Sequence, residues 1–126
     1  MSRRADFKAL NVKFPSLSLL LVVACVGFAP LAQADDAMIE EGRQIAFDRK
    51  KGNCLSCHSI AGGEVPGTIS VPLIAMQARF PDKGVLRQNV WDQTQFRPHA
   101  MMPPFGKHQI LTEEEIDKVV EFIHTL

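Results

Sequence analysis

Apolar and small residues recur at helical spacing in residues 36–50, where Met38, Gly42, Ile45 and Ala46 fall on one face. Acidic residues near the start of this stretch favour the positive end of a helix dipole. The pattern predicts an amphipathic helix over residues 36–50.

The clearest helix signal lies at the C-terminal end. Thr112-Glu113-Glu114-Glu115 has the form of a capping box, in which a threonine and the glutamate three residues later bond each other's backbone. Four apolar residues follow at helical spacing: Ile116, Val119, Val120 and Ile123. We expect a helix whose apolar stripe faces a core.

The chain between these helices has one further helix signal. Asp82 predicts an N-cap for a helix that runs to about residue 93. One face of that helix is expected to hold Val85, Leu86, Asn89 and Val90. Residues 73–76 are expected to form a short helical turn, and the proline- and glycine-rich residues 61–72 and 94–109 to form loops. No stretch alternates with period two, so the predicted fold class is all-α, with few helices and long loops.

Residues 1–34 have the pattern of a secretory signal peptide. Four basic residues precede an apolar run over residues 17–28, and the small-x-small site Ala32-Gln33-Ala34 follows. The apolar run is shorter than the roughly 20 residues that cross a bilayer. We therefore expect cleavage after Ala34, a mature domain of residues 35–126, and a periplasmic location.

Two other interpretations of this leader stay open. Val22-Val23-Ala24-Cys25 resembles a lipoprotein cleavage box, which would leave Cys25 acylated. Ser2-Arg3-Arg4 resembles a twin-arginine export signal, although adjacent arginines are common in a basic region by chance. The downstream Ala-x-Ala site favours ordinary cleavage over the lipoprotein alternative.

Removal of the leader changes the charge of the chain. The 126 residues carry 14 basic and 14 acidic side chains, whereas residues 35–126 carry ten basic and thirteen acidic ones. The resulting net charge of −3 does not favour a nucleic-acid surface. Only Cys54 and Cys57 remain as cysteines.

Those two cysteines belong to Cys54-Leu55-Ser56-Cys57-His58, which matches the C-x-x-C-H motif of covalent haem attachment. On a helical turn both thiols lie on nearly the same face, so they can add to the vinyl groups of one porphyrin while the imidazole reaches the iron. A redox dithiol would need a βαβ setting that is not predicted, and a zinc site would need a further ligand nearby. We expect one covalent haem c, with His58 as an axial ligand.

The second axial ligand is expected about 45 residues further on. Met101 and Met102 precede Pro103-Pro104, and a thioether on a stiffened loop suits low-spin haem iron and raises its reduction potential. Met102 is favoured because the prolines that follow it fix its backbone. Met101, His99 and His108 are the alternatives, and both methionines could instead fill space beside the haem.

Several segments together resemble the SoxX family of small monohaem c-type cytochromes, subunits of the SoxAX complexes of sulfur oxidation. The resemblance runs from about residue 42 to residue 126. It is carried by residues 48–58, Glu64-Val65-Pro66-Gly67-Thr68-Ile69, Met102-Pro103-Pro104-Phe105-Gly106-Lys107-His108, Ile110-Leu111-Thr112 and Glu115-Ile116-Asp117.

The resemblance implies a class I cytochrome c fold, with His58 and Met102 as axial ligands. The first and last helices would cross where Gly42 permits close approach, beside Phe122 or Ile123. In that fold a backbone carbonyl orients the haem histidine. The matching segment is Ser70-Val71-Pro72-Leu73, where serine and valine replace the usual glycine and proline, and the Val71 carbonyl is a candidate acceptor.

The resemblance also implies a heterodimer with a SoxA cytochrome, at which thiosulfate is joined oxidatively to a cysteine of the carrier SoxYZ. That complex is an enzyme, an L-cysteine S-thiosulfotransferase. This chain would accept the released electrons and pass them to a soluble cytochrome c, and we expect no catalytic residue in it. A free-standing electron carrier and a haem-based sensor are the alternatives.

Overall fold

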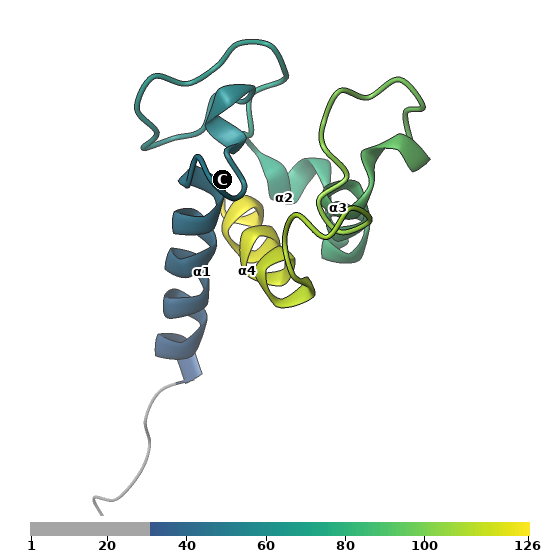
Figure 1. Ribbon diagram of the computed structural model, residues 1–126. Helices are drawn as coiled ribbons and strands as arrows, with labels where there is room; N and C mark the ends of the chain where they lie inside the picture. The colour runs from purple at the N-terminus through teal and green to yellow at the C-terminus, as the bar shows by residue number, and fades with distance from the viewer. Residues whose placement is uncertain (1–30) are drawn as a thin grey trace, which may run out of the picture.

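The computed structural model describes residues 31–126, with side chains from Asp35 onward. Its elements are α1 (Leu31–Phe47), the 3-10 helix η1 (Cys54–Ser56), α2 (Met76–Arg79), α3 (Lys83–Trp91), the 3-10 helix η2 (Gln93–Gln95) and α4 (Glu113–His124). No strand occurs within residues 31–126, so the all-α prediction is confirmed (Figure 1). In the same range, no helix is long and apolar enough to cross a bilayer.

The predicted leader falls mainly on residues 1–30, outside the described residues. The lipoprotein alternative at Cys25 lies there too. Cleavage after Ala34 therefore stays a prediction.

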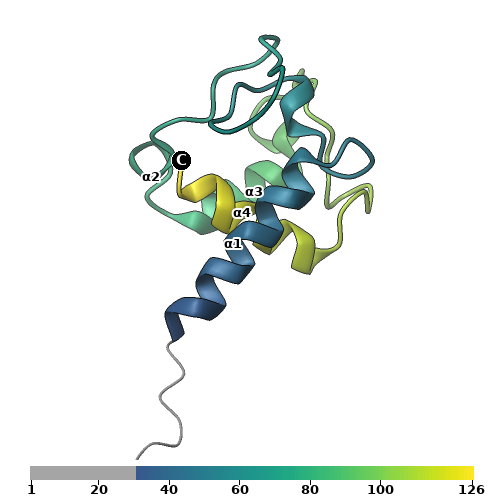
Figure 2. The ribbon, with the colours of Figure 1, turned by 90° about the vertical axis from the view of Figure 1, so that its left-hand side faces the viewer.

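Helices α1 and α4 cross each other and form the most extensive helix–helix contact (Figures 1 and 2). Gly42 permits this crossing, because a Cβ atom there would lie 1.9 Å from the backbone oxygen of Lys118 and 3.1 Å from Cβ of Phe122. Next to it, the rings of Phe47 and Phe122 pack edge to face with centroids 5.7 Å apart. The expected crossing at Gly42 is confirmed, with Phe122 as its neighbour.

The start of α4 is fixed by the predicted capping box. The Thr112 amide donates to the Glu115 carboxylate at 3.0 Å, and the Glu115 amide donates to the Thr112 hydroxyl at 3.2 Å. The predicted stripe is buried in full, and Phe122 joins it.

Four predicted boundaries are wrong by a few residues. Helix α1 begins at Leu31 rather than at residue 36. It ends at Phe47 rather than at residue 50, because the chain turns back at once: the Lys51 and Asn53 amides both donate to the Asp48 carbonyl. Gly52 closes this turn, since its amide donates to the Ile45 carbonyl at 3.1 Å and a Cβ atom would lie 2.7 Å from that oxygen.

The other two differences also have local causes. Helix α2 begins at Met76, where the predicted turn was expected to end, because Ala75 before it adopts a left-handed conformation with φ 50°. Helix α3 ends at Trp91 because the Asp92 side chain caps η2, accepting from the Thr94 amide at 3.0 Å. Asp82 caps the start of α3 as predicted, through the Gly84 amide at 2.7 Å.

The two long loops contribute to the core. Ile60 and Leu73 bracket the first loop, Phe105 and Leu111 lie at the end of the second, and all four are at most 8% exposed. They pack with the buried face of α4 in one cluster. The long loops are therefore held by apolar anchors at their ends.

Candidate functional site

Cys54 begins η1, directly after the turn that follows α1, and Cys57 caps the C-terminal end of η1. The Cys57 amide donates to the Cys54 carbonyl at 3.2 Å, and the His58 amide donates to the same oxygen at 2.9 Å. In a 3-10 turn, side chains three residues apart eclipse each other. Cys54 and Cys57 therefore share one side of the turn, and both are free thiols.

The environment of Cys54 does not suit redox catalysis by a thiolate. Burial raises the pKa of the Cys54 thiol to about 11. Reactive cysteines of dithiol oxidoreductases have a lowered pKa instead. Nor does the part of the chain from residue 31 onward contain a cluster of three or more His, Cys, Asp or Glu residues that could hold a metal ion. Neither the redox-dithiol nor the zinc alternative gains support.

His58 is oriented by a backbone carbonyl. Its Nδ1–H donates to the oxygen of Val71 at 2.7 Å, which leaves Nε2 as the ring nitrogen available for metal coordination. Two hydrogen bonds hold the segment that carries this acceptor: the Leu73 amide donates to the Ser59 carbonyl at 2.9 Å, and the Arg79 guanidinium donates to the Pro72 carbonyl at 3.0 Å. Val71 therefore accepts the hydrogen bond from His58, as expected, although it is not a proline.

The loop over residues 61–70 is hydrogen-bonded to the backbone of the haem motif. The Gly67 amide donates to the Leu55 carbonyl at 2.6 Å, and the Ser70 amide donates to the Cys57 carbonyl at 2.9 Å. A Cβ atom at Gly67 would lie only 2.1 Å from the Ser56 oxygen. The need for this glycine was not found from the sequence, where the glycines and prolines of residues 61–72 indicated only a loop.

The candidate distal residues differ in their orientation. Met101 is 84% exposed, whereas Met102 is half-buried and packs against the core. His99 and His108 are exposed. Among the four candidates, Met102 is the one whose side chain contacts the protein interior.

The loop that carries Met102 is fixed at its base by residues that sequence reasoning missed. The Gly106 amide donates to the Trp91 carbonyl at 3.1 Å, and a Cβ atom at Gly106 would lie 2.0 Å from the indole ring. Beside it, the Lys107 ammonium donates to Asp92 at 3.0 Å. In the sequence, the spacing Asp92-x-Thr94 suits a side-chain cap and could have indicated a structural role for Asp92.

Exposed apolar surface is concentrated on two segments that follow the cysteines. Eight large apolar side chains are exposed in the described residues, and six of them belong to residues 65–74 and 96–101. These are Val65, Ile69, Val71, Ile74, Phe96 and Met101. The residues fit a haem: two thiols on one side of a turn, an oriented imidazole, an inward thioether and loops rich in exposed apolar groups.

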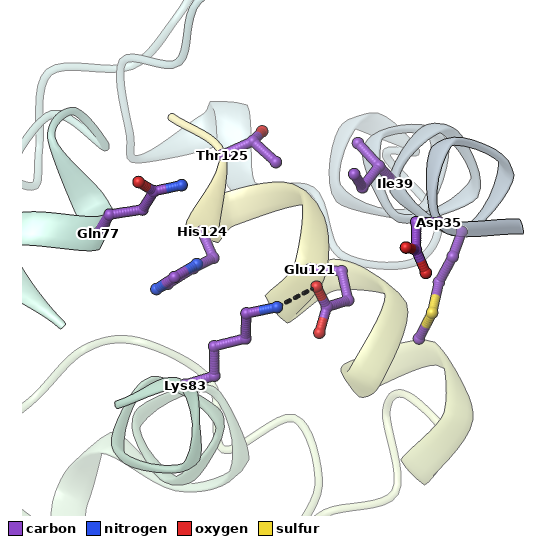
Figure 3. Close-up of a pocket in the computed structure, with 8 residues that line it drawn as sticks. Asp35, Ile39, Gln77, Lys83, Glu121, His124 and Thr125 are labelled. Carbon is purple, nitrogen blue, oxygen red and sulfur yellow. Dashed lines mark hydrogen bonds and ion pairs between the residues drawn. The ribbon is translucent and has the colours of Figure 1, made fainter. Parts of the chain in front are cut away.

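A hollow of about 370 Å³ lies elsewhere, between the first half of α1 and the end of α4 (Figure 3). Three of its polar side chains have partners. The Lys83 ammonium donates to Glu121 at 2.5 Å, and His124 Nε2 donates to the Phe80 carbonyl at 3.1 Å. The hollow is lined by no cysteine and by a single histidine, His124, which is already hydrogen-bonded.

The fold and the haem-fitting residues define a small helical protein that holds one haem through two thioether bonds. Comparison with known families agrees, because residues 39–126 match the cytochrome c family. The chain therefore belongs to the cytochrome c family, binds haem c covalently and functions in electron transfer.

One curated relative is the gluconate 2-dehydrogenase cytochrome c subunit of Pantoea cypripedii. It is 42% identical to this chain over 48 residues. The match covers 36% of this chain and 10% of the relative, so the likeness concerns a short part of a much longer protein.

Proposed function

We propose that this chain is the electron-transfer subunit of a SoxAX-type cytochrome complex, with His58 and Met102 as the axial ligands of its haem. When bound, the haem supplies a one-electron ferric/ferrous couple. Cys54 and Cys57 hold it covalently, and the chain's own residues fix the ligands around it.

The observation that carries an electron-transfer role is the hydrogen bond from His58 Nδ1 to the Val71 carbonyl at 2.7 Å. This bond fixes the ring and raises the basicity of its other nitrogen. Together with an inward Met102, it favours iron closed on both sides. Closed coordination suits electron transfer and does not suit a sensor, which needs an open position.

The ligand assignment is tested with two neighbouring methionines. Met102→Ala in the haem-loaded protein should abolish the near-infrared sulfur-to-iron band of the ferric state and lower the reduction potential. Met101→Ala is the matched control, because that side chain is 84% exposed, and it should leave the band unchanged. The opposite result would reverse the assignment.

The SoxAX assignment is supported by the segments around the haem motif and before α4 that resemble SoxX. The relative from Pantoea cypripedii is by its name also a cytochrome c subunit, which agrees with work inside a larger assembly. Residues 31–126 hold no group of three or more His, Cys, Asp or Glu side chains that could bind a metal ion, and we assign the sulfur chemistry to the SoxA partner.

Reconstitution tests this division of labour. The chain alone should be reducible and oxidisable, with no thiosulfate-dependent activity toward SoxYZ. Addition of the SoxA-type partner should create that activity, and a haemless Cys54→Ala/Cys57→Ala variant should reduce or remove it. Purification of a sugar-acid dehydrogenase with this chain from its host would instead favour a role like that of the Pantoea cypripedii relative, and a chain that purifies alone would favour the free-standing carrier.

The location is proposed to be the periplasm, after cleavage behind Ala34. The intact mass of the native protein should equal that of residues 35–126 plus one haem. A diacylglycerol adduct on Cys25 would establish the lipoprotein alternative instead.

A further inference from the structure

Asp92 is the one buried charged side chain in the described residues, at 2% exposure. It accepts from the Thr94 amide at 3.0 Å, from the Thr94 hydroxyl, and from the Lys107 ammonium at 3.0 Å. The chemistry assigned above makes no use of this carboxylate. A buried carboxylate is costly unless it is hydrogen-bonded and paired, so its position needs a reason.

The ion pair closes the loop that carries Met102. Asp92 stands directly after α3, Lys107 stands fifteen residues later, and Met102 lies between them. The adjacent backbone is closed at the same point, where the Gly106 amide donates to Trp91 at 3.1 Å. The two bonds fix both ends of one loop, and the loop itself contains no regular element after η2.

We propose that Asp92 and Lys107 are positioning residues that hold Met102 toward the haem iron. This inference rests on the proposed role of Met102 as a ligand. Withdrawal of the loop would separate Lys107 from Asp92 and leave a carboxylate buried without its cation. The ion pair therefore penalises loop positions in which Lys107 has moved together with the thioether away from the interior.

A purely structural role makes a different prediction. If Asp92 only caps η2 through Thr94, loss of Lys107 would lower global stability without affecting the iron–sulfur bond in the folded protein. The proposed role instead requires that the bond opens while the helices remain folded. Binding of imidazole to the ferric protein reports this opening, because exogenous imidazole must displace the methionine.

The experiment compares Lys107→Gln with Lys107→Arg and Lys83→Gln, all in the haem-loaded chain. Lys83 forms an ion pair with Glu121 between α3 and α4, away from the loop, so Lys83→Gln controls for loss of an ordinary ion pair (Figure 3). Lys107→Gln should bind imidazole about tenfold more tightly or better, as expected for loss of a hydrogen bond to a charged group. It should also lose the sulfur-to-iron band on heating before the helices melt. Lys107→Arg and Lys83→Gln should behave as wild type.

Equal imidazole affinity in Lys107→Gln and Lys83→Gln would overturn the proposal. If Lys107→Gln does not fold, Asp92→Asn/Lys107→Gln removes the buried charge as well, and it should show the same tighter imidazole binding. Wild-type affinity in that double variant would also overturn the proposal. Absence of the sulfur-to-iron band in the wild-type protein would mark a different failure, that of the Met102 assignment itself.

Discussion

The crossing of α1 and α4 depends on the absence of a side chain at Gly42, and Gly42→Ala tests how much. The added Cβ atom would lie 1.9 Å from the Lys118 oxygen, whereas ordinary contact begins near 3.4 Å. The helices must therefore separate locally by about 1.5 Å. A gap of only 0.5–1 Å already removes about a quarter to a half of the dispersion energy between facing atoms.

The magnitude follows from two opposing effects. Overpacking of a well-packed contact costs about 1–3 kcal/mol. Loosening of the edge-to-face pair between Phe47 and Phe122 adds to this cost, since such pairs contribute about 0.5–1.5 kcal/mol. Alanine is a better helix former than glycine by about 1 kcal/mol, which offsets part of the loss. The expected net destabilisation is about 0.5–3.5 kcal/mol, or roughly 2–28 °C in Tm for a domain of this size.

Thermal unfolding of the haem-loaded protein, followed by far-UV circular dichroism, measures the effect. Gly84→Ala is the matched control, because Gly84 is also helical but its nearest neighbour would be the end of the Asp82 side chain at 3.0 Å. That variant should melt at the wild-type temperature or slightly above it. If Gly42→Ala melts as high as Gly84→Ala, the close approach at Gly42 does not limit the packing of the two helices.

Three further outcomes are expected. Gly67→Ala should push the 61–70 loop away from the haem segment and lower Tm by several degrees, more than Gly84→Ala, where a Cβ atom would meet only the end of the Asp82 side chain at 3.0 Å; equal losses would count against the role of Gly67. Thr112→Ala should cost about 1 kcal/mol in guanidinium unfolding, because it removes the capping box of α4; a loss below about 0.3 kcal/mol would contradict this. Asp92→Asn should destabilise the protein in a pH-dependent way. The pKa of Asp92 is lowered to about 2, mainly by the Thr94 hydroxyl and then by Lys107, so the carboxylate stabilises the fold above its ordinary pKa of 3.8 and loses this contribution as the pH falls through about 2. The difference between wild type and Asp92→Asn should therefore be full near neutral pH and disappear toward pH 2; a difference that persists there would refute this assignment.

Features encoded by neighbouring residues could be predicted from the sequence. The haem motif, the caps at Asp82 and Thr112 and the stripe of α4 each depend on residues within one or two turns, and each is found where it was expected. The role of Gly52 could not be predicted, because it depends on the carbonyl of Ile45, which only the turn after α1 brings near. The same holds for Asp92, whose partner Lys107 stands fifteen residues later, at the other end of the same loop.

The two sides of the site are held by different means, and this explains which sequence departures it tolerates. On the His58 side the bonds come mainly from backbone groups: the Val71 carbonyl, the Leu73 amide and the Gly67 amide. Any residue carries such groups, so valine can replace the family's usual proline at 71 without loss of the acceptor, whereas Gly67 has no room for a side chain. On the Met102 side, the ion pair between Asp92 and Lys107 closes the loop together with the backbone bond at Gly106, which also has no room for a side chain. We therefore expect the proposed ligand Met102 to respond to loss of a single charge as well as to added volume, and His58 mainly to added volume.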